Sequence, residues 1–282
     1  MFYEIPIKYK PKGGKSCKED TFYFPCTVSG YSGGYTYPAT TFGELDGDLH
    51  PNVGALIWDN PWDDPDEGKD VVCSDTLIAP NVFLTAAHCV NWMPSYGIPA
   101  DGVWVTFDSV FDAETGIFYE GTYYINPNAW HDSSDAEDVT VVVLDEPITS
   151  ITPAVLPPAG LLDEMKADHE LKDQLFVTVG YGTVRDDKTG DPHPLYWEGA
   201  RRFAEQSYNA LTKGWLKLSM NPSTGDGGTC YGDSGGPHLL GDSNMVVSLT
   251  VTGDMWCRAT DVTYRLDIES ARDYLDDFVD LP

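Results

Sequence analysis

A serine held between glycines is the group in this chain best suited to attack a carbonyl carbon. It is Ser234, in the segment Gly232–Pro237, which reads Gly-Asp-Ser-Gly-Gly-Pro and whose glycines let the backbone approach a reacting carbonyl closely. Serine is a weak nucleophile unless a histidine takes its proton and an acid orients that histidine. Both partners occur upstream: His88 lies in the run Leu-Thr-Ala-Ala-His-Cys, and Asp138 opens a run of β-branched residues. Together these residue types predict nucleophilic acyl transfer.

The order of these three residues separates two fold classes. The segment around Ser234 also fits the Gly-x-Ser-x-Gly nucleophile elbow, in which the acid and the base follow the serine. The only histidine after Ser234 is His238, which is too close in sequence to come from a separate element. We therefore reject the elbow. With the order His88, Asp138, Ser234, the chain over residues 41–282 resembles the chymotrypsin/trypsin-like family of serine endopeptidases, as a bacterial-type member.

Cysteine spacing and a glycine-rich turn carry the same resemblance. Gly180–Gly182, which reads Gly-Tyr-Gly after a short strand-like run, looks like the family's Gly-aromatic-Gly turn. Six cysteines permit fifteen pairings from sequence alone, and the resemblance selects among them. It implies a histidine-loop disulfide, Cys73 with Cys89, and a disulfide beside the specificity pocket, Cys230 with Cys257. Cys17 and Cys26 remain, and we expect them to pair with each other.

Composition narrows the compartment and the partners. The even cysteine count favours an oxidising compartment, and no apolar run approaches the ~20 residues that span a bilayer. No hydrophobic signal segment follows Met1, so secretion is inferred from the cysteines and the family. The net charge of -28 argues against nucleic-acid binding, which requires clustered Lys and Arg. We expect a secreted, monomeric protein that acts on polypeptides and neither enters a membrane nor binds nucleic acid.

Charge is unevenly distributed, and the change marks a boundary. Residues 1–40 carry five Lys against three acidic residues, a balance of +2, which leaves 12 basic and 42 acidic residues, or -30, for the remainder. The segment 1–40 is either a disordered leader or a pro-segment or accessory arm, and residues 41–282 form the peptidase domain. The acidic stretch Asp59–Asp70 could hold calcium, although its spacing matches no calcium loop. His50 and His131 lack partners at ligand spacing, so we assign them structural roles and expect no metal or cofactor.

Eleven strand-like runs, separated by Gly, Pro and Asp turns, fall into two groups on either side of the proline-rich stretch 151–160. They predict an all-β protein of two antiparallel barrels, which the resemblance makes six-stranded Greek-key barrels over about 41–150 and 161–266. From Asp267, apolar residues recur at helical spacing. This pattern predicts a C-terminal helix over about 267–279 with Asp267 as its N-cap.

The resemblance also assigns roles. His88 and Asp138 come from the first barrel and Ser234 from the second, so the active site lies between the barrels. His88 takes the proton of Ser234, and Asp138 holds the imidazole; Asp135 and Glu137 are rivals, but only Asp138 directly precedes the apolar strand. The backbone N–H groups of Gly232 and Ser234 form the oxyanion hole.

The chain departs from the family pattern in its activation sequence and in its specificity pocket. Where relatives expose a new Ile-Val-Gly-Gly terminus that pairs with the acid before the nucleophile, here Asp233, this chain has Thr41–Glu44. Either Thr41 becomes a terminus by another cleavage, or Asp233 is satisfied internally. At the pocket base, six residues before the nucleophile, Gly228 replaces the trypsin-like Asp. The pocket residues under this alignment are Gly228, Thr229, Tyr231, Thr252, Gly253 and Asp254, although an alignment through Ser248 is open.

The missing charge at Gly228 predicts a preference for an apolar or aromatic residue before the scissile bond, although Asp254 could restore some preference for basic residues. The main alternative is a catalytically silent relative that keeps the fold for binding, yet such a protein would normally have lost a triad residue. An esterase that uses the same acyl chemistry is a second alternative.

Overall fold

The computed structural model describes residues 41–59, 68–132, 134–185 and 195–282. The segment 1–40, with Cys17 and Cys26, and most of the acidic stretch Asp59–Asp70 lie outside the described residues. The leader, the third disulfide and the calcium loop therefore stay predictions.

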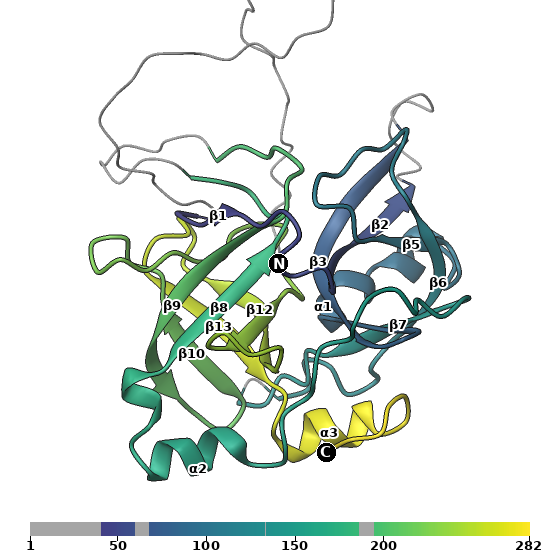
Figure 1. Ribbon diagram of the computed structural model, residues 1–282. Coiled ribbons are helices and arrows are strands. Elements are labelled where there is room, and N and C mark those ends of the chain that lie inside the picture. Colours follow the sequence, from purple (N-terminus) through teal and green to yellow (C-terminus); the bar gives the residue numbers. More distant parts are fainter. Residues whose placement is uncertain (1–40, 60–67, 133, 186–194) are drawn as a thin grey trace, which may run out of the picture. The chain divides into compact units, whose positions relative to one another are not determined.

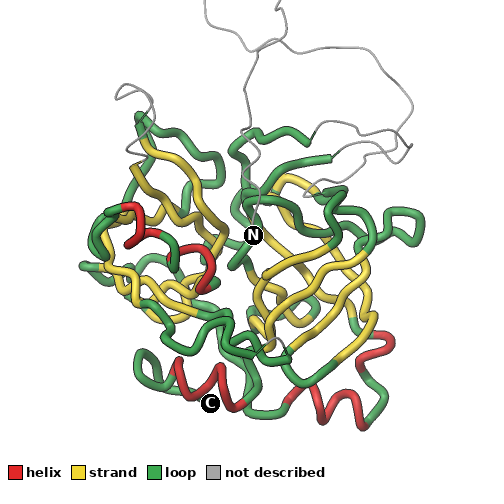
Figure 2. The backbone as a smooth tube through the Cα atoms, turned by 180° about the vertical axis from the view of Figure 1, so that it is seen from behind, coloured by secondary structure: helices red, strands yellow, loops and turns green. Residues whose placement is uncertain are grey.

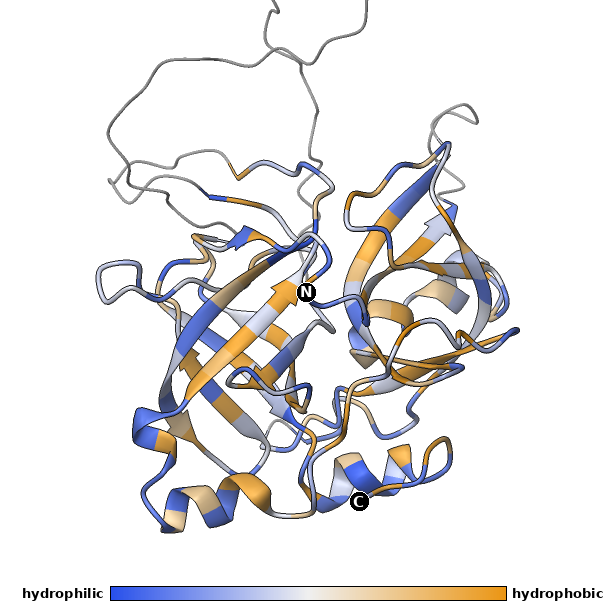
Figure 3. Cartoon of the chain, in the orientation of Figure 1, coloured by the Kyte–Doolittle hydropathy of each residue, from blue (hydrophilic) through white to orange (hydrophobic). Residues whose placement is uncertain are grey.

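Six strands close the first barrel, in the order β2-β3-β4-β7-β6-β5 (Figure 1). All neighbouring pairs are antiparallel, and apolar side chains from β2, β3, β4 and β7 fill the interior. Figure 3 shows orange, apolar positions recurring along the strands. The strands are β2 (Val53–Asp59), β3 (Lys69–Ala79), β4 (Val82–Thr85), β5 (Val103–Thr106), β6 (Tyr119–Tyr124) and β7 (Thr140–Leu144).

The second barrel is a sheet in the order β9-β10-β13-β12-β11-β8, which closes because β8 also pairs with β9. The short strand β1 (Glu44–Leu45) pairs antiparallel with the first two residues of β9, Arg202 and Phe203. The six barrel strands are β8 (Leu175–Gly180), β9 (Arg202–Leu211), β10 (Trp215–Ser219), β11 (Pro237–Leu240), β12 (Val246–Gly253) and β13 (Thr260–Arg265). The expected fold class, two antiparallel six-stranded barrels with a C-terminal helix, is confirmed (Figure 2).

Short helices lie at the ends of the strands. α1 (Ala87–Val90) and the 3-10 turn η1 (Met93–Tyr96) follow β4, whereas α2 (Leu161–Ala167) and η2 (Leu171–Asp173) precede the second barrel. α3 (Glu269–Leu275) is the predicted C-terminal helix, and its apolar face packs against the core. None of the described helices is long and apolar enough to cross a membrane.

The prediction of Asp267 as the cap of α3 is wrong. The N-cap residue is Ile268, which makes no side-chain capping bond. The Asp267 carboxylate instead accepts the N–H of Leu162 at 2.8 Å and pairs with the buried Arg265 at 2.9 Å. Asp267 therefore joins the start of α2 to the end of β13. A carboxylate makes stronger, charge-assisted hydrogen bonds to a buried guanidinium than to the N–H groups of an exposed helix end.

Candidate active site

His88 and Asp138 form a directly bonded pair. His88 lies in α1, and Asp138 lies two residues before the start of β7 and is fully buried. The Asp138 carboxylate accepts the backbone N–H of His88 at 2.8 Å and contacts His88 Nδ1 at 2.7 Å. One carboxylate thus fixes both the backbone and the ring of the histidine. This arrangement favours the tautomer with a proton on Nδ1, which leaves Nε2 able to accept one.

Ser234 occupies a tight turn that leads into β11. The turn requires glycine at two positions, because φ is +96° at Gly232 and +79° at Gly235. The Ser234 carbonyl accepts the N–H of Ser74 in β3 at 3.0 Å, and Cys73, next to Ser74, is disulfide-bonded to Cys89, next to His88. A few short links therefore tie the serine to the segment that carries the histidine.

No hydrogen bond joins Ser234 Oγ to the His88 ring among the described residues. Such contacts are often long in ligand-free enzymes and tighten when the substrate binds. The arrangement therefore contains a bonded His–Asp pair and a partly buried serine anchored to the same region.

The N–H groups of Gly232 and Ser234 have no acceptor within the described part of the chain. The carbonyls around them are all bonded, so the turn is fixed while its two N–H groups stay free. Two neighbouring backbone donors beside a serine hydroxyl are suited to bind an oxygen on which negative charge develops.

Asp233, between those donors, is fully enclosed. Its carboxylate accepts the N–H of Gly182 and the N–H of Cys230, both at 2.8 Å. Burial raises the pKa of Asp233 to about 7, against the opposing effect of these two hydrogen bonds. No cation pairs with it among the described residues, and Thr41 is itself buried, with its carbonyl accepting the N–H of Gly228 at 3.0 Å. The sequence left two alternatives for Asp233, pairing with a new amino terminus at Thr41 or internal hydrogen bonds. In the intact chain Asp233 has internal hydrogen bonds.

A cavity of about 310 Å³ opens next to Ser234. Besides Ser234, five of the six pocket residues expected from the sequence line it, namely Thr229, Tyr231, Thr252, Gly253 and Asp254. Met220, Thr250, Val251 and Met255 also line it, as does the disulfide between Cys230 and Cys257. The sequence missed the two methionines, because nothing in their local pattern marks them as pocket residues.

Gly228, expected at the base of the pocket, is not among the lining residues. A Cβ at this position would overlap the Cβ of Met220 and come within 2.9 Å of Gln206 Nε2. Glycine is therefore required by packing beneath the cavity. The side chain of Met220 fills the space that a larger residue at position 228 would need.

Asp254 lines the cavity, but its carboxylate is committed to its own loop. Its oxygens accept the backbone N–H groups of Trp256, Arg258, Ala259 and Thr260 at 2.7–3.2 Å. These hydrogen bonds hold the pKa of Asp254 below its ordinary value although burial opposes them. Four donors already satisfy the charge, so Asp254 is poorly placed to attract a basic side chain.

The rival acids near Asp138 have other partners. Asp135 accepts the hydroxyl of Tyr264 at 2.8 Å and that of Ser270, which joins the segment before β7 to β13 and α3. Glu137 has a positive φ of 48° and offers its backbone carbonyl to Asn126 Nδ2 at 3.0 Å. Neither is bonded to the His88 ring.

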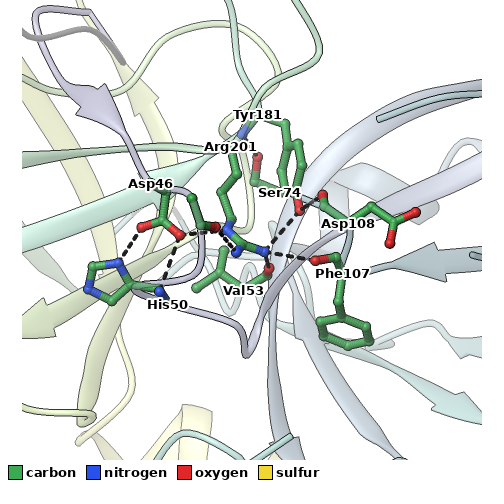
Figure 4. Close-up of polar contacts among 9 residues, drawn as sticks. Asp46, His50, Val53, Ser74, Phe107, Asp108, Tyr181 and Arg201 are labelled. Carbon is green, nitrogen blue, oxygen red and sulfur yellow. Dashed lines mark hydrogen bonds and ion pairs between the residues drawn. The ribbon is translucent and has the colours of Figure 1, made fainter. Parts of the chain in front are cut away.

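A buried arginine connects the two barrels (Figure 4). Arg201, which immediately precedes β9, is 1% exposed and donates from Nε to Asp46 at 2.8 Å. Its Nη1 donates to the carbonyls of Val53 at 2.8 Å and Phe107 at 3.0 Å, both in the first barrel. The same nitrogen lies 3.3 Å from the hydroxyl of Tyr181 in the second. One guanidinium thus binds the segment after β1 and both barrels.

His50, expected to be structural, completes this network. Its Nδ1 contacts Asp46 Oδ1 at 2.5 Å, and its ring packs against Phe203. Although burial opposes it, hydrogen bonds from His50 and Arg201 lower the pKa of Asp46 overall.

Two other features carry none of this chemistry. A larger cavity of about 660 Å³ lies between α2 and α3, where Arg265 is neutralised by Asp163 and Asp267. Within the described residues, one group of metal-ligating types lies close together, Cys73, His88 and Cys89, and its two sulfurs are joined in a disulfide.

A sequence model of the family described as Trypsin matches residues 60–267, which is more than half of the chain. The chain belongs to the trypsin family. Similar proteins include a trypsin of Saccharopolyspora erythraea, 26% identical over 64% of this chain and 75% of its own length. Trypsin delta of Drosophila melanogaster is 20% identical over 74% of this chain and 80% of its own length.

The venom plasminogen activator Haly-PA of Gloydius brevicauda is 25% identical over 59% of this chain, and the match spans 62% of the activator's own length. The trypsin family and the names of these relatives support a serine peptidase with polypeptide substrates.

Proposed function

We propose that this trypsin-family protein is a secreted serine endopeptidase that cleaves peptide bonds through an acyl-enzyme intermediate. Ser234 attacks the scissile carbonyl, and His88 takes its proton and passes it to the leaving amine. Asp138 fixes the imidazole tautomer and stabilises its cation. The N–H groups of Gly232 and Ser234 bind the oxyanion, each contributing roughly 3 kcal/mol. The observation that carries the proposal is the His88–Asp138 pair, bonded at 2.7 Å and tied to a serine turn with two free N–H donors.

Secretion is supported by two disulfides in the described residues, since such bonds persist in oxidising compartments. The preference for an apolar or aromatic residue before the scissile bond is supported by the cavity lining. Met220, Val251 and Met255 contribute apolar surface, and the charge of Asp254 is satisfied by its own loop.

The test is labelling of the intact chain with a fluorophosphonate probe, with Ser234→Ala as the control. We expect labelling that vanishes in the variant, together with a fall in peptide hydrolysis of about 10⁶-fold. If the intact chain is not labelled but the chain without its first 40 residues is, the protein is a proenzyme. Absence of labelling in both forms would indicate a binding protein and overturn the proposal.

A peptide library tests the preference separately, with wild-type protein and equal amounts of substrates that place Phe, Leu, Lys or Arg before the scissile bond. We expect faster cleavage after Phe or Leu. Faster cleavage after Lys or Arg would overturn the apolar preference and implicate Asp261. This buried acid pairs across the sheet with Gly253 and has one carboxylate oxygen without a hydrogen-bond partner among the described residues.

A further inference from the structure

Ser74 in β3 donates two hydrogen bonds to the serine turn and accepts a third from Tyr181. It is fully buried and belongs to the first barrel, whereas the turn belongs to the second. Its N–H donates to the Ser234 carbonyl at 3.0 Å. Its hydroxyl donates to the Gly232 carbonyl at 2.9 Å and accepts the N–H of Tyr181 at 2.8 Å. With one donor and one acceptor function in use, the hydroxyl has a single orientation.

The peptide units of the turn show what these contacts do. Four consecutive carbonyls, from Tyr231 to Ser234, each accept one hydrogen bond. The donors, in order, are the N–H of Thr183, the hydroxyl of Ser74, the N–H of Gly236 and the N–H of Ser74, at 2.8, 2.9, 2.9 and 3.0 Å. Because a peptide unit is planar, fixing a carbonyl also fixes the N–H that shares its plane.

The first and third of these units carry the free N–H groups of Gly232 and Ser234. The unit between them, which joins Gly232 to Asp233, sets the angle between the two donors. It pivots on Gly232, whose φ of +96° lies where glycine moves with little steric restraint. Its carbonyl is held by Ser74 Oγ, the one side-chain donor of the four. That side chain is therefore the part of the restraint that a substitution can remove.

The hydroxyl is itself held from behind. Tyr181, which donates to it, has its hydroxyl bonded to the Asp108 carbonyl at 2.8 Å and lies against Arg201, as Figure 4 shows. Its own carbonyl accepts the indole N–H of Trp197 at 2.7 Å. The Ser74 hydroxyl is thus held by Tyr181, which belongs to the inter-barrel network, and donates a hydrogen bond to the serine turn.

We propose that Ser74 is a positioning residue of the oxyanion hole, in that its hydroxyl fixes the peptide unit between the two N–H donors and so links their geometry to the docking of the barrels. This inference rests on the proposed endopeptidase function. Ser74 does not contact the substrate, and its effect passes through the Gly232 carbonyl.

The test compares Ser74→Ala with Thr76→Val, a matched control. Thr76 lies two residues along the same strand, is equally buried, and has a hydroxyl without a hydrogen-bond partner among the described residues. Active-site titration with the fluorophosphonate probe gives the fraction of competent enzyme for each protein. Steady-state kinetics on that fraction then separate kcat from KM.

We expect Ser74→Ala to lower kcat about 10-fold with KM changed by less than about twofold, because only transition-state binding is lost. The affinity for a peptide boronic acid, which forms a tetrahedral adduct on the serine, falls by the same factor. Thr76→Val leaves both values unchanged. A kcat within about twofold of wild type, or a loss explained by a lower titre of folded enzyme, would overturn the proposal.

Amide hydrogen exchange tests the role of Ser74 without relying on catalytic activity. The Asp233 N–H, which donates to the Cys230 carbonyl at 3.0 Å, belongs to the restrained peptide unit. We expect it to exchange faster in Ser74→Ala than in wild type, while amides of β7 remain unchanged. An inert wild-type protein would refute the endopeptidase alone, whereas unchanged exchange at Asp233 would refute the role of Ser74.

Discussion

In the His88–Asp138 pair, replacement of one carboxylate oxygen by an amide group should change catalysis without changing the fold. Asp138 receives two donors from His88, one from the backbone and one from the ring. An asparagine in its place offers one oxygen and one N–H group to the same two contacts. If the amide N–H faces Nδ1, the ring adopts the tautomer that carries its proton on Nε2, and it can no longer accept the proton of Ser234.

Asp138→Asn is therefore expected to lower kcat about 10⁴-fold at pH 7, with a small change in melting temperature. Asp135→Asn is the matched control, because Asp135 is also buried but serves Tyr264 and Ser270. It should retain kcat within a few-fold and lose stability instead. Steady-state kinetics and thermal unfolding on both variants decide the matter. A kcat of Asp138→Asn within tenfold of wild type would contradict the assigned role of Asp138.

At the scale of elements, strong periodicity made most strands predictable. Ten of the eleven predicted runs have both their first and their last residue within two positions of those of an observed strand, as with Val82–Thr85, which is identical to β4. β9 was missed because Glu205, Gln206 and Asn209 break the apolar pattern, although Gln206 is buried and donates to Asp261. Here a buried polar pair replaces the apolar signal on which strand prediction depends. α2 was missed because its seven residues carry only a short apolar stripe.

The candidate site was partly readable from the sequence. Motif spacing was enough to select His88 and Asp138, which the structure joins in a hydrogen bond. Ser74, Arg201 and Asp46 carry no local signal, because their partners lie up to 158 residues away in sequence. Contacts that form only when two barrels dock leave no trace in periodicity.

The Arg201 network links β1, both barrels and the Tyr181 turn, so its loss should affect more than one element. Arg201→Met is expected to destabilise the protein by about 3–5 kcal/mol, since it leaves the Asp46 carboxylate buried without its cation and several carbonyls without donors. Arg202→Met is the matched control, because Arg202 pairs with the partly exposed Glu198. It should cost less than Arg201→Met, because the Glu198 carboxylate that loses its partner is in contact with solvent. Urea unfolding measures both.

A double-variant cycle sharpens this prediction. Arg201→Met with Asp46→Asn should lose less stability than the two single variants combined, because each single change strands the partner. The carbonyls of Val53 and Phe107 still lose their donor, so the double variant stays below wild type. Additive losses would show that Asp46 and Arg201 do not act as a pair.

For the whole molecule, acidity makes stability sensitive to pH. The net charge of -28 means that self-repulsion grows as carboxyl groups ionise. Asp75 adds a specific effect, because it is fully buried in β3 and no cation pairs with its carboxylate among the described residues. Burial raises its pKa well above the ordinary value, and the hydroxyl of Thr85 opposes this only in part. A Cβ on Gly235 would overlap Asp75 Oδ1, so this acid lies directly behind the serine turn.

The sign of its contribution follows from proton uptake. Between the ordinary pKa of 3.8 and the raised value, the folded state keeps the Asp75 proton while the unfolded state releases it. The folded state therefore binds more protons, and its stability falls as pH rises through this range. Asp75→Asn removes the proton but keeps the shape. Its free energy of unfolding should rise relative to wild type by about 1.4 kcal/mol per pH unit from pH 5 upward.

Asp48→Asn, at an exposed position, removes the same formal charge without the burial and controls for the general repulsion. Chemical unfolding of the three proteins at pH 5, 6, 7 and 8 should give parallel curves for wild type and Asp48→Asn and a diverging curve for Asp75→Asn. Divergence that stops at one pH would mark the point where folded Asp75 ionises, because above that pH both states have lost the proton. Parallel curves for all three would mean that Asp75 is already ionised in the folded protein, and that a cation or water compensates it behind the serine turn.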